Sequence, residues 1–159
     1  MNDLVFDLAH HDDIPEIMRL YKSLISMTGD SWNLHYPNAE IAKRDIDNNS
    51  LYILKKNEVI IAAASVGGSE ELKHLPWNPQ NPCELSRVSV KPEFQRQGIG
   101  SLLLYHTIRI AQEKGFDGIC MLVSKTNPAA LALYEKHGFE QCGETFMYDK
   151  DFYCYQMTF

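Results

Sequence analysis

One stretch decides the fold: residues 84–101 read ELSRVSVKPEFQRQGIGS. Its first half is an apolar strand candidate that ends at Pro92, because proline has no N–H to continue a ladder of hydrogen bonds. Its second half is a loop with Gly98 and Gly100, which lack a Cβ atom and let a ligand approach the main chain closely. A helix with a broad apolar face begins at Ile99. The stretch therefore predicts a strand, a glycine-bearing loop and a helix in direct succession.

The start of this helix suits a phosphate group. A helix N-terminus presents unpaired N–H groups and the positive end of the helix dipole. Arg96 adds a cation at the same place. Two interpretations stay open on these residues alone, because short glycine motifs also occur without a ligand. One is a pyrophosphate cradle, and the other is an ordinary connection between a strand and a helix.

Apolar periodicity and turn residues predict seven strands and four helices along the chain. The strands are expected at residues 4–8, 51–55, 59–66, 84–90, 118–123, 139–148 and 152–157, and the helices at 13–26, 38–47, 99–114 and 128–137. The strand at 118–123 is apolar without alternation, which is typical of a central strand buried on both faces. With the strand and helix before it, it predicts a β-α-β unit with parallel strands and a right-handed crossover. We expect a single α/β (α+β) domain over residues 1–159, a length that supports one substantial core.

The charge of the chain limits the classes of partner that it is expected to bind. The formal net charge is -6 and the isoelectric point is near 5.4. This balance argues against nucleic-acid binding, which needs a basic face, and is compatible with cationic substrates such as amines. No apolar run is long enough to span a bilayer, and residues 2–4 do not resemble the basic start of a signal peptide. We therefore expect a cytoplasmic protein with no nucleic-acid or membrane partner.

The cysteines and histidines do not have the spacing of a metal site. The four cysteines, Cys83, Cys120, Cys142 and Cys154, lie far apart in or beside apolar runs and form no C-x-x-C pair. We expect buried reduced thiols rather than disulfides or zinc ligands. The six histidines show no H-x-x-x-H or H-x-E spacing. The sequence therefore predicts no bound metal.

Two motifs resemble those of one family. Val88-x-Val90-x-Pro92 followed by Gln95-x-x-Gly98-x-Gly100 is similar to motif A of the GNAT superfamily of N-acetyltransferases. Residues 127–139, NPAALALYEKHGF, are similar to its motif B. The predicted order of strands and helices resembles that fold over essentially the whole chain. The resemblance implies a mixed sheet of about seven strands with four helices, in which the two central parallel strands splay apart.

The resemblance also implies an acyl-CoA donor, usually acetyl-CoA. It places the diphosphate on the backbone amides of residues 96–101, with Gln95 and Arg96 in support, and the pantetheine arm along the splayed strand as a pseudo-strand. Asn127 would reach the donor from the second motif. The implied cofactor-binding residues are Val88, Ser89, Val90, Gln95, Arg96, Gln97, Gly98, Ile99, Gly100, Ser101, Asn127 and Tyr134.

The chemistry of acetyl transfer needs a base, because only a neutral amine attacks a thioester. Glu84 is the candidate: it begins an otherwise apolar strand, where a partly buried carboxylate has a raised pKa. The alternatives are a solvated acid at the strand end with a water chain as base, or a base from Glu70, Glu71 or Asp30 in the loops.

Two further groups complete the expected chemistry. A backbone N–H on the splayed strand, near Val90, is the candidate donor to the oxyanion. By resemblance, Tyr134 protonates the departing thiolate; the alternative is an aromatic residue that only packs on the sheet. No cysteine is needed, because in this family the acyl group passes directly to the acceptor.

We therefore expect an N-acetyltransferase that moves an acetyl group from acetyl-CoA to a primary amine. A small molecule or amino acid is favoured as acceptor, because the aromatic loop at 31–37 and the long loop at 67–82 can close a small pocket. The alternatives are acetylation of protein N-termini or lysines, and a non-catalytic acyl-CoA-binding or sensing domain. The aromatic final hairpin fits either the core or a seam between two copies, so a homodimer stays open.

Overall fold

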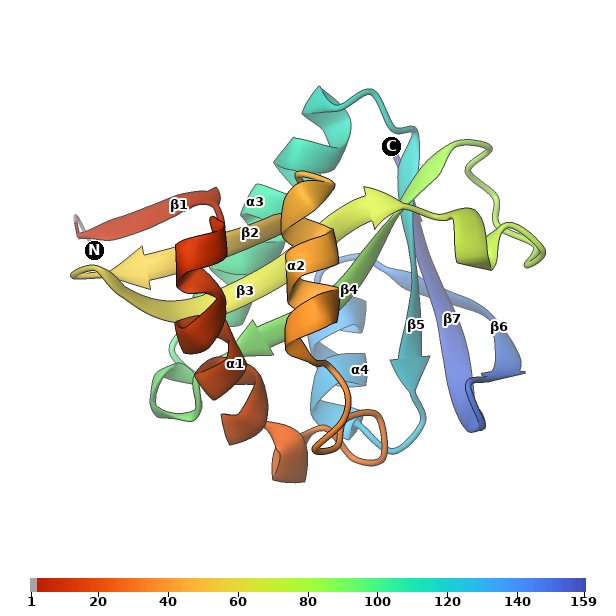
Figure 1. Cartoon of the computed structure of the whole chain (residues 1–159). Coiled ribbons are helices and arrows are strands. Elements are labelled where there is room, and N and C mark those ends of the chain that lie inside the picture. The colour runs from red at the N-terminus through yellow and green to blue at the C-terminus, as the bar shows by residue number, and fades with distance from the viewer. Residues whose placement is uncertain (1–2) are drawn as a thin grey trace.

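A seven-stranded mixed sheet forms the centre of the computed structural model, which describes residues 3–159 (Figure 1). The strand order is β1-β2-β3-β4-β5-β7-β6. The strands are β1 (Leu4–Leu8), β2 (Leu51–Lys56), β3 (Val59–Gly68), β4 (Pro82–Val90), β5 (Gly118–Ser124), β6 (Glu140–Met147) and β7 (Lys150–Thr158). The helices are α1 (Ile14–Ser23), α2 (Ala39–Asp47), α3 (Ile99–Glu113) and α4 (Pro128–Lys136). The predicted fold class and element order are confirmed.

Two helices cover each face of the sheet, and the alternation of the strands explains how. Successive side chains of a strand point to opposite faces. In β2, Leu51 and Ile53 pack in one buried cluster with Ile17 of α1, whereas Leu54 packs in the other with Leu103 of α3. Figure 1 shows α1 and α2 on one side of the sheet and α3 and α4 on the other. The core is therefore two apolar layers with the sheet between them.

The two central strands are parallel only at their beginning. β4 pairs with β5 from Pro82↔Gly118 to Glu84↔Cys120, and the strands then diverge, as Figure 1 shows. β5 stays paired with β7 along its whole length. The edge of β4 that faces β5 is therefore open beyond Glu84, and this confirms the splay that the resemblance implies.

A β-bulge interrupts β4 just beyond the point of divergence. Ser86 pairs with Ser65 of β3, but Ser89 already pairs with Ala63, so two residues of β4 stand opposite one of β3. Arg87 lies in this bulge with a φ of 51°, in the left-handed region that side chains other than glycine seldom adopt. Such a conformation costs on the order of 1–3 kcal/mol and persists only where the surroundings stabilise it.

Some boundaries differ from the prediction. The first helix ends at Ser23, and a separate 3-10 turn covers Ile25–Met27. The last hairpin turns at Tyr148 and Asp149 rather than at 149–151, because both residues have positive φ angles of 55° and 65°, which matches the twist of the flanking strands. The sequence pattern indicated the elements correctly but not the residues at which the backbone reverses.

The remaining expectations concern burial. All four cysteines are free, and three of them are buried. In the final hairpin Tyr155 is buried, whereas Phe146 and Tyr148 are 64% and 60% exposed. Part of that hairpin therefore belongs to the core, and a homodimer stays a prediction.

Within residues 3–159 no helix is long and apolar enough to cross a membrane. Residues 1 and 2 of the expected domain lie outside the described residues.

Candidate active site

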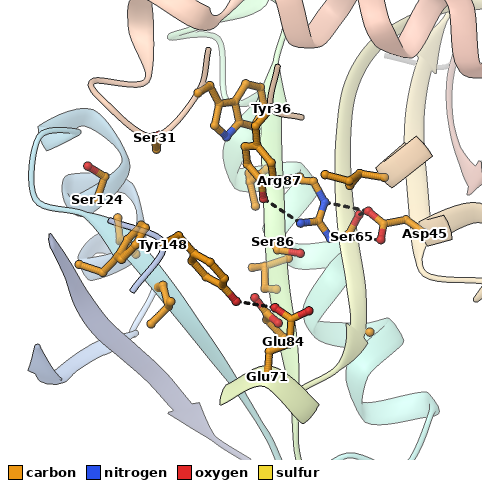
Figure 2. A pocket seen from close by; sticks show the side chains of 18 of the residues that line it. Ser31, Tyr36, Asp45, Ser65, Glu71, Glu84, Ser86, Arg87, Ser124 and Tyr148 are labelled. Atoms are coloured by element: carbon orange, nitrogen blue, oxygen red, sulfur yellow. Dashed lines mark hydrogen bonds and ion pairs between the residues drawn. The ribbon is translucent and has the colours of Figure 1, made fainter. Parts of the chain in front are cut away.

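A cavity of about 700 Å³ opens where β4 and β5 diverge. Its walls come from the loop between α1 and α2, from α2 itself, from β3, β4 and β5, from the segment between β3 and β4, from α4, and from the turn between β6 and β7. Figure 2 shows the polar side chains gathered around it, with Glu71 and Glu84 together and Arg87 beside Asp45. Of the residues predicted for the site, Glu84, Val88, Asn127 and Tyr134 line this one cavity.

Glu84 lies in β4 on the cavity wall with its carboxylate largely withdrawn from water. Burial raises its pKa from the ordinary 4.5 to about 7; Arg87 opposes this rise, and the negative charges of Glu71 and Asp45 add to it. Glu71 accepts a hydrogen bond from the Tyr148 hydroxyl (Figure 2). Across the described chain no ion pair is found for Glu84 or Glu71. The carboxyl group of Glu84 is therefore placed to exchange a proton near neutral pH.

Tyr134 lies in α4 and is 7% exposed. Its ring packs edge-to-face on Phe139, with 5.8 Å between the ring centroids. Burial raises the pKa of its hydroxyl above the ordinary value of 10, so the hydroxyl stays protonated. The structure of residues 3–159 gives this hydroxyl no hydrogen-bond partner, although the residue lines the cavity. Tyr134 thus combines a packing role with a free proton donor.

The N-terminus of α3 has the main-chain geometry of an anion site. Gly98 is the N-cap with a φ of 82°, and Arg96 before it also has a positive φ, of 63°. The first helical hydrogen bond runs from the Leu102 N–H to the Gly98 carbonyl, so the preceding N–H groups have no acceptor inside the helix. A Cβ atom at Gly98 would meet nothing within 4 Å, whereas one at Gly100 would lie 3.3 Å from Leu133. Gly98 therefore faces open space, and Gly100 lets α3 approach α4.

The side chains around this N-terminus mostly hold the loop itself. Gln95 donates its side-chain amide to the Val90 carbonyl at 2.9 Å, and Gln97 donates to the Glu93 carbonyl at 2.9 Å. The Ser101 hydroxyl lies 2.7 Å from a ring nitrogen of His137. These contacts leave the backbone N–H groups, with Arg96, as the groups that can hold a diphosphate.

The other predicted cofactor residues divide between the cavity and the core. Asn127 lines the cavity, and its side-chain carbonyl also accepts the Ala130 N–H at 3.3 Å and so caps α4. Ser89 is 2% exposed and donates to the Ala63 carbonyl, and Ile99 is 8% exposed. Val90 lies beside Gly100, outside the cavity wall. Val88 is thus the motif valine that reaches the cavity.

Asp30, a further candidate base, fastens a loop instead. Its carboxylate accepts hydrogen bonds from the hydroxyls of Ser124 and Thr126, at 2.7 and 2.8 Å, and these bonds lower its pKa. Gly29 makes the approach feasible, because a Cβ atom there would lie 2.2 Å from the Thr126 hydroxyl oxygen. The loop between α1 and α2 is thereby tied to the end of β5.

Sequence reasoning missed the ion pair between Arg87 and Asp45. The guanidinium of Arg87 holds both carboxylate oxygens of Asp45, at 2.7 and 3.1 Å, and also donates to the Tyr36 hydroxyl at 3.0 Å. No local signal indicated this pair, since its partners lie on β4 and α2, far apart in the chain. A group of three or more His, Cys, Asp or Glu side chains that could hold a metal does not occur within the described residues.

The chain matches the model of the acetyltransferase (GNAT) family over residues 17–139. It belongs to the GNAT family. Among curated relatives, it is 27% identical over 135 residues to the mouse protein N-acetyltransferase family 8 member 3, across 82% of this chain and 59% of that protein. It is 40% identical over 57 residues to [Ribosomal protein bS18]-alanine N-acetyltransferase of Escherichia coli (strain K12), across 36% of this chain and 38% of that protein. The chain therefore spans less than two thirds of the length of these relatives.

Solved structures of the GNAT family share the fold across almost the whole chain. An acetyltransferase of this family from Streptococcus agalactiae has a TM-score of 0.83 at 19% identity, over 98% of this chain and 95% of that one. A PaiA N-acetyltransferase from Thermoplasma acidophilum, solved in complex with coenzyme A, has a TM-score of 0.75 at 16% identity, over 98% and 99% of the two chains. At these identities the likeness shows the fold.

Proposed function

We propose that this GNAT protein is an N-acetyltransferase that moves the acetyl group of acetyl-CoA directly to a primary amine. One observation carries the proposal. A carboxyl group with a pKa of about 7, Glu84, and a protonated hydroxyl without a partner in the described chain, Tyr134, line the same cavity from its two sides, β4 and α4. A proton acceptor and a proton donor are the two groups that transfer from a thioester to an amine requires.

The residues present fit acetyl-CoA. Open space in front of Gly98, the unpaired N–H groups at the start of α3 and the charge of Arg96 suit its diphosphate. The open edge of β4 beyond Glu84 suits an extended arm that adds to the sheet. When bound, acetyl-CoA supplies the acetyl group as a thioester. In this proposal the nearby residues Gln95, Gln97 and Ser101 shape the loop that presents these amides.

The side chains then move two protons. Glu84 accepts a proton from the acceptor's ammonium group and leaves the amine neutral, which its pKa allows near pH 7; the second proton, which becomes acidic once the nitrogen has attacked, passes to solvent. Backbone N–H groups on the open edge of β4, at Val88 rather than at Val90, donate to the acyl oxygen as it gains negative charge. The Tyr134 hydroxyl donates its proton to the departing sulfur, and solvent restores it.

The cavity supports a small amine as acceptor. The turn between β6 and β7 reaches both neighbouring loops, since Tyr148 bonds to Glu71 and Lys150 donates to the Ser31 carbonyl at 3.4 Å. These contacts join the turn to both loops at the cavity wall, and the acidic Glu71 and Glu84 attract a cation. The local identity to a ribosomal-protein alanine acetyltransferase supports a second candidate, the N-terminus of a protein.

A free-thiol assay tests the proposal. Purified protein is given acetyl-CoA and, separately, small amines, amino acids and peptides with a free N-terminal alanine, and CoA release is followed. We expect release that depends on a small amine. Release only with peptides would favour the protein acceptor. No amine-dependent release with any acceptor, together with tight binding of CoA by calorimetry, would favour a non-catalytic binding or sensing domain. We further expect the protein to act in the cytoplasm, without a nucleic-acid or membrane partner.

A further inference from the structure

A buried ion pair joins three elements beside the bulge of β4. Asp45 of α2 is 4% exposed, and both of its carboxylate oxygens accept from Arg87 of β4. Ser65 of β3 donates to the same carboxylate at 2.8 Å. The remaining arm of the Arg87 guanidinium donates to the Tyr36 hydroxyl of the loop between α1 and α2. Figure 2 shows Arg87 lying between Tyr36 and Asp45 at the edge of the cavity.

The pair and the bulge depend on each other. Ser86 pairs with Ser65, whose hydroxyl bonds to α2, so Ser86 faces the side of the sheet that α1 and α2 cover. In a regular strand the next residue would face the opposite side. The positive φ of Arg87 instead keeps its side chain on the side of α2, where Asp45 holds it. Every residue of β4 after the bulge is thereby displaced by one position relative to its pairing partner in a regular strand.

The displacement decides what β4 presents to the cavity. Ser89 pairs with Ala63 and is buried beneath α1 and α2, whereas Val88 packs toward α3 and α4 and lines the cavity. Without the bulge, a shift of one residue would exchange these two faces. The same shift would change which backbone N–H groups of β4 point toward β5.

A contribution to stability alone does not explain the pair. Burying two charges costs solvation energy that their attraction seldom exceeds, and well-packed apolar side chains often replace such a pair without loss. A bidentate guanidinium does, however, add geometric specificity, because its two parallel contacts are satisfied in one orientation only. Arg87 has a left-handed backbone conformation and lies on the cavity wall, so a rigid backbone at this residue can affect the site.

We propose that Arg87 is a positioning residue for acetyl transfer: its ion pair with Asp45 holds the β4 bulge so that the backbone N–H groups after it face the acyl oxygen. This inference rests on the proposed function, since it assigns those N–H groups to the acyl oxygen of acetyl-CoA. Tyr36 extends the same clamp to the loop that covers the acceptor side of the cavity.

The test compares Asp45→Asn and Arg87→Lys with Asp47→Asn, a matched control on α2 whose side chain is 50% exposed and lies outside the cavity. Calorimetry measures the Kd of CoA and of acetyl-CoA, and the thiol assay measures kcat. The preference for acetyl-CoA over CoA reports the contact with the acyl oxygen without any reaction. One such hydrogen bond corresponds to about a threefold to tenfold preference.

We expect the control to keep the wild-type preference and kcat. Asp45→Asn should lose the preference and lower kcat by about 100-fold, as loss of an oxyanion donor does, with the Kd of CoA changed less than twofold. Should Asp45→Asn fail to fold, Arg87→Lys, which keeps the charge but not the two-pronged contact, is expected to show the same loss. A folded variant with wild-type preference and kcat would overturn the inference, as would the absence of any acetyl preference in the wild type. If the wild type acetylates no amine, the proposed function fails, and the acetyl preference of the variants still decides the role of Arg87.

Discussion

Replacement of Glu84 by Gln tests the proposed base through stability as well as activity. Gln has nearly the same shape as Glu and is uncharged at every pH. The folded protein holds the pKa of Glu84 at about 7 against an ordinary value of 4.5, chiefly because burial disfavours the charged form. The folded chain therefore binds the Glu84 proton more tightly than the unfolded chain does.

The sign and size of the effect follow from linkage. Because the folded pKa is raised, the stability that the protonated carboxyl contributes is fully present below about pH 4.5 and is lost as the pH rises through about 7. One pKa unit corresponds to about 1.36 kcal/mol, so the whole difference corresponds to about 3 kcal/mol. Glu84→Gln should therefore have a free energy of unfolding that exceeds that of the wild type by an amount that grows to about 3 kcal/mol above pH 8.

Urea unfolding of both proteins at several values between pH 5 and pH 9 measures this difference. In parallel, acetyl transfer by the wild type should rise with an apparent pKa of about 7, and Glu84→Gln should lose about a hundredfold to ten-thousandfold of the rate. Glu70→Gln is the control, because it removes one negative charge from the same cavity at a side chain that is 78% exposed. A stability difference that stays constant from pH 5 to pH 9 would refute the raised pKa, and an unchanged rate would refute the role as base.

The remaining predictions concern the cofactor site, the leaving group and the loop. Gly98→Glu should weaken CoA binding at least about tenfold in calorimetry, because a carboxylate would enter the space that we propose for the diphosphate and the residue needs a positive φ; an unchanged Kd would contradict the placement. Tyr134→Phe should lower kcat while the Kd of acetyl-CoA stays within about twofold, since only the hydroxyl is lost; wild-type turnover would leave Tyr134 with packing alone. Asp30→Ala should speed amide hydrogen exchange in residues 28–32, because it removes the hydroxyl contacts of Ser124 and Thr126; unaltered exchange would show that the loop needs no such tie.

The local sequence was sufficient wherever one element carries its own signal. Asn127 and Pro128 predict the start of α4, and the Asn127 side chain caps that helix as expected. Gly98 predicts a backbone position at the start of α3 that suits glycine, and its φ there is 82°. An acid among apolar strand residues predicts the raised pKa of Glu84. For the two helix starts, neighbours in sequence supply the physical cause; for Glu84, the apolar neighbours indicate the burial that raises its pKa.

The site as a whole depends on contacts that no local pattern records. The sequence predicts that Gly100 lets a ligand approach the main chain, yet Gly100 also lies against Leu133 of α4, a helix that sequence order alone does not place there. Asp30 is a candidate base by sequence, but the fold brings its carboxylate to the hydroxyls of Ser124, at the end of β5, and of Thr126 just after it. The Tyr148 hydroxyl reaches Glu71 only because the fold brings the turn of the last hairpin to the same cavity wall.

Residues 84–101 show which features the local sequence determines and which depend on the tertiary structure. By itself this stretch determined a strand, a loop that suits a phosphate and a helix, because backbone freedom, helix dipoles and apolar periodicity act between near neighbours. The tertiary structure alone decided that Arg87 leaves the regular strand, since the compensating carboxylate of Asp45 is 42 residues away. A strained residue is stabilised by what surrounds it in space, and that surrounding exists only once the chain has folded.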